Sequence, residues 1–303
     1  MASLHIEVKD CRPVKIVDGH LHASGRETAA EVLAALDEAG VEMACILAPF
    51  LTPPYSLHDA ETLRAANGHV AGLVRGHGDR LVGFAVVNPA LPGAPEEVER
   101  AAGLGLRGLK LVPAGWYPYD EAALAVYAVA EAFGLPLLFH SGVFIDGRSS
   151  RFCRPAYYEA VRDTPRLRVS LAHLGWPWSD EAIAVALIDR IKGVEPQGCQ
   201  FRLDISFGPP PPYRRQVVGL AWQVLGAELL IYGSDRFLPC SGEELRQAHG
   251  EARSLLEELG LAREQVRQVL AENALGWLNV GGRPASSPPA AEPGLLPSRS
   301  LSR

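Results

Sequence analysis

The chain has 303 residues, of which 48% are hydrophobic and 21% are charged. This composition is ordinary for a globular protein with a substantial core, and a single α/β barrel can occupy this length. The formal net charge of −6 argues against a nucleic-acid partner, because nucleic-acid-binding proteins usually carry a basic surface.

The amino terminus, MASLHIEVKD, carries charges and has no apolar segment of the signal-peptide kind. No run approaches the roughly 20 apolar residues of a spanning helix. We therefore expect a cytoplasmic protein with no membrane partner. In a reducing compartment the scattered cysteines, which form no CxxC pair, are expected to be small core residues. They are Cys11, Cys45, Cys153, Cys199 and Cys240.

Short apolar or β-branched runs alternate along the chain with longer segments of helical period, rich in Ala, Leu and Glu. This alternation is typical of βα units around a parallel sheet. Helical segments such as 27–40, 121–134 and 180–193 each end in the Gly that commonly follows a helix. Strands are predicted at 14–18, 42–48, 81–87, 107–112, 136–140, 168–173, 201–206 and 229–234.

Eight strands with eight helices is the count of a (β/α)8 TIM barrel, and we predict one such domain over residues 1–280. A last helix, 263–280, is expected to pack outside the barrel. Residues 281–303 are rich in Pro, Gly and Ser and lack aromatic residues, so a disordered tail is predicted there. Homo-oligomers are common for this barrel, and no motif fixes a stoichiometry.

Two pairs of residues match the S-x-x-E capping box that begins a helix. Ser24 with Glu27 follows the first predicted strand, and Ser241 with Glu244 follows the eighth. We expect a helix to begin at each pair.

Polar residues interrupt the apolar runs at the predicted carboxyl ends of the strands. Buried parallel strands usually read as continuous apolar runs, so these exceptions are informative. In a closed barrel they would converge on the face where barrel enzymes build their active sites. They are Asp18, His20, His22, Lys110, His140, His173 and Asp235.

The first of these groups lies in VDGHLH, residues 17–22. The alternation of an extended chain places His20 and His22 on one side, where both imidazoles can approach one ion, and Asp18 shares that parity. A single histidine at a strand end is more often structural. The combination with later strand-end residues favours a metal site.

Another imidazole and a carboxylate from across the barrel would complete a nitrogen and oxygen site suited to Zn, Mn or Fe. His140 and Asp235 fit those roles. His173 is then the candidate general base or acid, or the ligand of a second ion.

With these residues, the chain resembles the amidohydrolase superfamily, specifically the amidohydrolase-related (family 2) group of TIM-barrel metal-dependent hydrolases and decarboxylases. The matching motifs together span residues 14–280. They are VDGHLH (17–22), GLKLVP (108–113), GLPLLFHSG (134–142), LRVSLAHLG (167–175), LLIYGSD (229–235) and ENALGWL (272–278).

The resemblance implies one catalytic divalent metal, most readily Zn, with Mn or Fe as alternatives, and assigns His173 to the substrate or the water. Asp18 is expected to orient an imidazole from a supporting position. Lys110 is ambiguous: carboxylated, it would bridge a second metal, and otherwise it would form an ion pair. One metal is favoured. The implied ligands are His20, His22, His140 and Asp235.

The implied reaction is hydrolysis of an amide, ester or lactone bond of a small carboxylate-bearing substrate by a metal-activated water, with Asp235 or His173 accepting its proton. Similar proteins use the same ligands for non-oxidative decarboxylation of small aromatic or unsaturated acids, and the sequence does not separate the two reactions. A barrel that binds a ligand without catalysis is a third possibility. It would be favoured by a substituted ligand position, and none of the core positions is substituted.

Aromatic and arginine residues after the strand ends are candidates for pocket walls and for carboxylate binding. The substrate-binding residues expected from this pattern are Trp116, Arg151, Trp176 and Arg236. Further candidates of the same kinds are Tyr55, Tyr117, Tyr119, Trp178, Arg148, Arg154 and Arg214.

Overall fold

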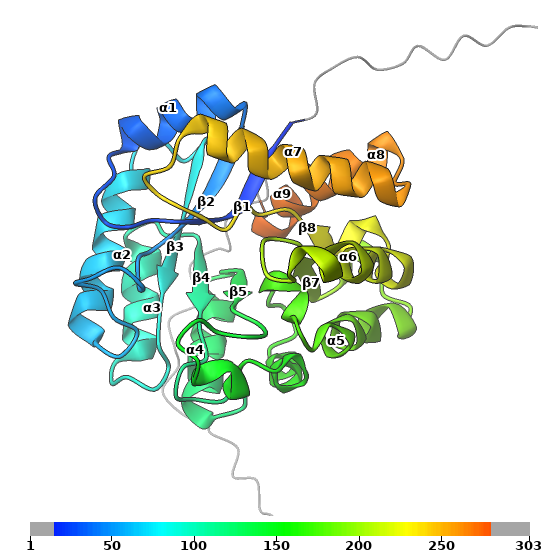
Figure 1. Ribbon diagram of the computed structural model, residues 1–303. Helices are drawn as coiled ribbons and strands as arrows, with labels where there is room; N and C mark the ends of the chain where they lie inside the picture. Colours follow the sequence, from blue (N-terminus) through cyan, green and yellow to red (C-terminus); the bar gives the residue numbers. More distant parts are fainter. Residues whose placement is uncertain (1–14, 280–303) are drawn as a thin grey trace, which may run out of the picture.

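The computed structural model describes residues 15–279, and its parallel strands curl into a (β/α)8 barrel (Figure 1). Strands β1 to β8 pair with their neighbours in chain order, and all eight predicted strands are present. The first is longer than predicted and includes both histidines of the HxH motif. The strands are β1 (Val17–His22), β2 (Met43–Leu47), β3 (Leu81–Val86), β4 (Gly108–Leu111), β5 (Leu137–Phe139), β6 (Val169–Leu171), β7 (Phe201–Asp204), β8 (Leu230–Ile231) and β9 (Arg236–Phe237).

The barrel closes between its first and last strands. β9 follows shortly after β8 and pairs in parallel with β1. Between them, Gly19 N donates to Tyr232 O at 3.0 Å and Asp235 N donates to His20 O at 2.8 Å. A side chain on Gly19 would place its Cβ 2.9 Å from Tyr232 O, so only glycine permits this approach. β8 and β9 thus form two halves of the eighth strand, with Asp235 at the interruption.

β1 contains a bulge against β2. The register passes from Asp18 beside Ala44 to Leu21 beside Ile46, so three steps along β1 match two along β2. The bulge reverses the alternation of side chains. Asp18 therefore shares the outward side of Ala44 and Leu21, which pack in the core under the helices, whereas His22 lies on the inward side. The prediction that Asp18 shares the parity of the two histidines is wrong for this reason.

Helices cover the outer side of the strands (Figure 1). In the described residues an α-helix follows every strand position except β5, so the α-helix expected after the fifth strand is absent there. Two 3₁₀ segments, Ser149–Phe152 and Pro155–Asp163, occupy that place, and the buried residues of the second, Pro155, Tyr158 and Val161, recur every third position as a 3₁₀ helix requires. The helices are α1 (Ala29–Ala39), α2 (Ala60–Val74), α3 (Ala94–Gly103), α4 (Glu121–Ala132), α5 (Ser179–Ile191), α6 (Pro211–Leu225), α7 (Gly242–Leu259), α8 (Arg263–Arg267) and α9 (Asn273–Leu278).

The start of α1 differs from the prediction. Its N-cap is Thr28, which forms a capping box with Glu31. Glu27 precedes the helix, and its buried carboxylate accepts hydrogen bonds from Ser24 N at 3.0 Å and Ser24 Oγ at 2.7 Å. The predicted Ser24–Glu27 helix cap is therefore wrong, because this pair closes the loop instead. The predicted capping box at 241–244 is confirmed.

The predicted helix 263–280 is present within the described residues as α8, a π-helical segment (268–272) and α9. It lies across the amino-terminal end of the barrel rather than on its outer wall. Trp277 is fully buried there, with its ring centroid 5.4 Å from that of Phe84. Arg168 fixes this helix by donating from Nε to Trp277 O at 2.7 Å.

The cysteines in the described residues are free. Cys45, Cys153 and Cys199 are buried, as expected, and Cys240 is partly buried. Cys11 and the predicted tail, 281–303, lie outside the described residues. Within residues 15–279 no helix is long and apolar enough to cross a membrane.

Candidate active site

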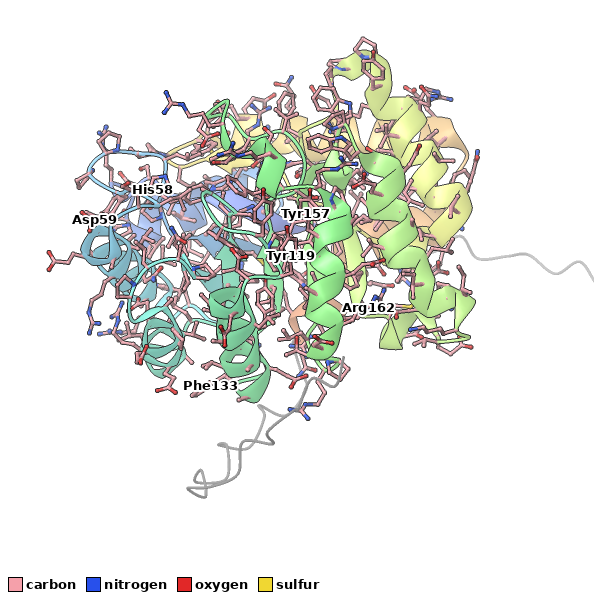
Figure 2. The ribbon with its side chains drawn as sticks, turned by 90° about the horizontal axis from the view of Figure 1, so that it is seen from below. His58, Asp59, Tyr119, Phe133, Tyr157 and Arg162 are labelled. Atoms are coloured by element: carbon pink, nitrogen blue, oxygen red, sulfur yellow. The ribbon has the colours of Figure 1, made fainter. Side chains whose placement is uncertain are left out.

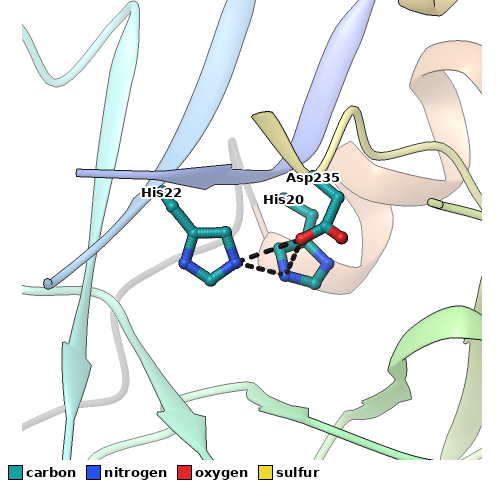
Figure 3. A group of neighbouring side chains, drawn as sticks. All are labelled: His20, His22 and Asp235. Carbon is teal, nitrogen blue, oxygen red and sulfur yellow. Dashed lines mark hydrogen bonds and ion pairs between the residues drawn. The ribbon is translucent and has the colours of Figure 1, made fainter. Parts of the chain in front are cut away.

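Two imidazoles and a carboxylate meet at the carboxyl end of the barrel (Figure 3). Nε2 of His20 lies 3.1 Å from Nε2 of His22. Oδ1 of Asp235 lies 3.1 Å from His22 Nε2 and 3.3 Å from His20 Nε2. The elements explain this convergence, because β1 carries both histidines inward and the break between β8 and β9 turns Asp235 toward them.

Asp204, at the end of β7, fixes the tautomer of His20. The carboxylate Oδ2 lies 2.6 Å from His20 Nδ1, so that nitrogen carries the proton and Nε2 keeps its lone pair. Asp204 is not among the strand-end residues predicted from the sequence. The available signal was a lone carboxylate in the otherwise apolar end of FRLDIS (201–206).

A second imidazole is oriented by the same loop. Ser206 Oγ donates to Asp204 Oδ2 at 2.8 Å, and the same oxygen lies 3.0 Å from His173 Nδ1. Because Ser206 donates its single hydroxyl proton to Asp204, its Oγ accepts the hydrogen bond from His173 Nδ1. This leaves His173 Nε2 as the proton acceptor. His173 and Asp235 both adopt left-handed backbone conformations, with φ of 60° and 55°, a feature that clusters at functional sites.

His140 lies beside His173, with ring centroids 5.1 Å apart. Its Nε2 donates to the carbonyl of Val143 at 3.0 Å, which leaves Nδ1 as the free lone pair. In the described residues, the three ligand atoms that converge most closely belong to His20, His22 and Asp235. The assignment of His140 as an additional ligand stays a prediction.

Lys110 reaches the cluster from β4. Its Nζ lies 3.1 Å from His20 Nε2, and the side chain is buried. Burial lowers its pKa to about 8. No carboxylate among residues 15–279 forms an ion pair with it, so the ion-pair alternative is not observed there.

Asp18 supports the backbone rather than an imidazole. Its Oδ1 accepts from His20 N at 3.0 Å and from Ser234 N at 2.9 Å. Burial raises its pKa to about 6. Asp18 thus ties β1 to the segment that follows β8, and the expected contact with an imidazole ring is absent within the described part of the chain.

Burial sets the charge of the imidazoles. It lowers the pKa of His20, His22 and His140 below the usual histidine value, and it lowers the pKa of His173 to about 4. Burial alone would raise the pKa of Asp235, but the surrounding histidines hold it below its usual range. The imidazoles are therefore neutral, and the carboxylate of Asp235 beside them is ionised.

This donor set fits a divalent cation. The lone pair of His20 Nε2 faces His22 Nε2 and an ionised carboxylate oxygen within 3.3 Å. A divalent cation could be held between these atoms, because two imidazoles with a carboxylate are ligands of Zn, Mn and Fe.

A cavity of about 310 Å³ opens above the cluster, and the inward side chains of His22, Lys110, His173 and Asp235 form its polar floor. Trp176 lines it, as predicted for a substrate-binding residue. Its other walls are apolar, and they include Phe50, Val143, Phe144, Ile145, Phe207 and Phe237.

The other predicted substrate-binding residues do not line this cavity. Trp116 is buried in the core, with its indole Nε1 lacking a partner. Arg151 is exposed over the ring of Phe152, and Arg236 lines a neighbouring cavity. Strand-end position identified Trp176 but not these three residues, because the path of each loop depends on its packing partners and not on the strand before it.

The predicted aromatic wall after β4 forms a separate surface cluster. Tyr117 and Tyr119 stack with ring centroids 5.1 Å apart. Tyr157 lies edge-on to Tyr119, with ring centroids 5.5 Å apart; both residues are labelled in Figure 2. These tyrosines contact one another and do not line the cavity above the cluster.

Comparisons with known proteins agree with this fold. The amidohydrolase family model matches residues 17–280. No curated protein shows significant sequence similarity to the chain.

Three solved structures illustrate the structural likeness. A 5-carboxyvanillate decarboxylase from Sphingomonas paucimobilis is 20% identical, with a TM-score of 0.62 over 88% of this chain and 99% of that one. Its counterpart from Novosphingobium aromaticivorans, with bound manganese, is 16% identical, with a TM-score of 0.60 over 88% and 97%. An amidohydrolase from Burkholderia multivorans with bound zinc is 13% identical, with a TM-score of 0.60 over 88% and 99%.

Proposed function

Because this chain belongs to the amidohydrolase family, we propose that it is a metal-dependent hydrolase of an amide, ester or lactone bond in a small carboxylate-bearing substrate. One observation carries the proposal. His20 Nε2, His22 Nε2 and Asp235 Oδ1 lie 3.1–3.3 Å apart beneath a cavity at the carboxyl end of the barrel.

We assign the metal to His20, His22 and Asp235, with His140 as a further ligand through Nδ1. Zinc is the first choice, and manganese or iron are alternatives, since similar structures hold zinc or manganese. A bound divalent ion supplies a lowered pKa for water and polarises a carbonyl group.

The protein residues supply proton transfer and orientation. His173 is neutral, and Ser206 fixes its Nδ1–H, so Nε2 can accept the proton of an attacking water and return it to the leaving group. Asp235 Oδ2, which lies 3.9 Å from His173 Nδ1, is the other candidate acceptor. Lys110 places a positive charge beside the cluster, where negative charge develops on the substrate.

Non-oxidative decarboxylation of a small aromatic or unsaturated acid is the second candidate. Its support is the apolar cavity wall, together with the structural likeness to two proteins named 5-carboxyvanillate decarboxylases. In that reaction His173 would deliver a proton to carbon instead of accepting one from water.

One panel tests both candidates. Lactones, amides, esters and aromatic carboxylates are assayed with zinc-loaded, manganese-loaded and metal-depleted protein, with ring opening, released acid and evolved carbon dioxide as readouts. We expect metal-dependent hydrolysis that is lost in His20→Ala and Asp235→Asn, both of which keep the circular dichroism spectrum of the barrel. Carbon dioxide release without hydrolysis would favour the decarboxylase. Full activity in the metal-depleted protein or in His20→Ala would exclude both.

A further inference from the structure

A second cavity of about 580 Å³ lies beside the first, between the loop after β7, the segment after β8 and helix α7. Phe207 and Asp235 line both cavities. Phe207 is 66% exposed, so one of the two shared residues is a largely solvent-exposed side chain. A ligand that enters the first cavity is therefore next to the second.

Three arginines and two carboxylates line the second cavity. Of these arginines, only Arg215 forms an ion pair within the described residues, with Glu258 at 3.0 Å. Arg214 donates to the carbonyls of Ile205 and Ser206 at 2.8 and 3.0 Å, so it is oriented without losing its charge.

Arg236 is the second cation without a carboxylate. It follows the metal-site residue Asp235 directly, and its guanidinium has no hydrogen-bond or ion-pair partner among residues 15–279. Neither carboxylate that lines the cavity, Asp235 or Glu251, forms an ion pair with it. Asp235 contacts the imidazoles of His20 and His22, and Glu251 accepts a hydrogen bond from Gln247.

The first cavity has no arginine among its lining residues. Lys110, the cation in its lining, lies at the metal cluster beside His20, so a carboxylate distant from the reacting bond would lack a cationic partner there, and burying it unpaired would be costly. Guanidinium groups bind carboxylates through paired, charge-assisted hydrogen bonds, which suits Arg236 to this task.

We propose that the second cavity is an anion subsite, in which Arg236, assisted by Arg214, holds the distal carboxylate of the substrate whose scissile bond lies in the first cavity. This assignment rests on the proposed hydrolase function and specifies its substrate class: a small acid with the carboxylate and the reacting bond on opposite sides of Phe207.

The test compares Arg236→Gln with Arg215→Gln, a matched control that removes a charge from the same cavity but one already paired with Glu258. The substrates are p-nitrophenyl hydrogen glutarate and its neutral methyl ester. We expect Arg236→Gln to lower the ratio of kcat/KM for the acid over the ester by about ten- to a hundredfold, the range for losing a hydrogen bond to a charged group. Arg215→Gln should leave that ratio unchanged, and metal content should be equal in all three proteins. An unchanged ratio in Arg236→Gln, or an equal fall in the control, would overturn the subsite.

A binding measurement separates failure of the subsite from failure of the hydrolase proposal. Glutarate and inorganic phosphate are titrated calorimetrically into the metal-loaded proteins. If the wild type cleaves neither ester, weaker glutarate binding in Arg236→Gln than in Arg215→Gln still supports the subsite, and equal binding overturns it. Phosphate binding that depends on Arg236 and is as tight as glutarate binding would assign the cavity to a free anion and overturn the substrate assignment.

Discussion

The carboxylate of Asp204 lies 2.6 Å from Nδ1 of His20, although the two residues are 184 positions apart in the chain. This contact gives His20 the tautomer in which Nε2 faces His22 and Asp235. A carboxylate behind a metal-binding imidazole orients the ring and raises its basicity, and losing such a partner typically weakens metal binding about 10- to 100-fold.

Asp204→Asn should therefore weaken metal binding by about that factor while the barrel stays folded. The measurement is a chelator competition followed by elemental analysis. Asp189→Asn is the matched control, since Asp189 is also buried and accepts from Arg162 and Gln200 far from the cluster. It should lower stability and leave metal affinity intact. Wild-type affinity in Asp204→Asn would contradict the role we give to this contact.

His140 and His173 should respond differently to removal. We expect His140→Ala to lose metal affinity, because Nδ1 is the lone pair left free by the hydrogen bond to Val143. His173→Ala should keep its metal and lose about 10²- to 10⁴-fold in kcat, the range for a general base. The metal content and steady-state rates of the two variants distinguish a metal ligand from a general base. Unchanged metal affinity in His140→Ala would remove it from the ligand set.

A Lys110 variant can show whether the site binds one metal ion or two. We expect one ion per chain in the wild type, with or without added bicarbonate, and one in Lys110→Met, because the amine lies beside His20 Nε2 as a charge rather than as a bridge. Elemental analysis after loading gives the stoichiometry. If bicarbonate raises the wild type to two ions and leaves Lys110→Met at one, the lysine is carboxylated and the site is binuclear.

The buried carboxylate of Glu27 should make part of the free energy of unfolding sensitive to acid. Burial alone would raise its pKa, but hydrogen bonds from His69 and Ser24 lower it from 4.5 to about 2. A carboxylate whose pKa is lower in the folded state than in the unfolded state stabilises the fold fully at pH values above its unfolded-state pKa. That stabilisation is lost as the pH falls from about 4.5 to about 2. The contribution at neutral pH is at most about 3 kcal/mol.

Glu27→Gln should be less stable than the wild type at pH 7, and the gap should narrow toward pH 3. Urea denaturation at several pH values measures it. Glu31→Gln, in the exposed capping box of the same helix, is the control and should cost less at pH 7. A gap that stays constant with pH would show that Glu27 acts through packing or geometry rather than through its charge.

The sequence determined the parts of this protein that depend on local pattern. Apolar runs of strand length located all eight strands, and strand-end polarity selected His20, His22 and Asp235, which meet in the barrel. Local pattern suffices here because parallel strands in chain order bring their carboxyl ends to one face whatever the intervening loops do.

Tertiary structure decided what depends on register and loop direction. The bulge in β1 turned Asp18 away from the side predicted for it, since one extra residue reverses the alternation of a strand. Asp204 gained its role only when β7 was placed beside the histidines. Arg151 and Arg236, chosen by the same strand-end rule, point to solvent and to a second cavity, because a loop's path is fixed by its packing partners and not by the strand that precedes it.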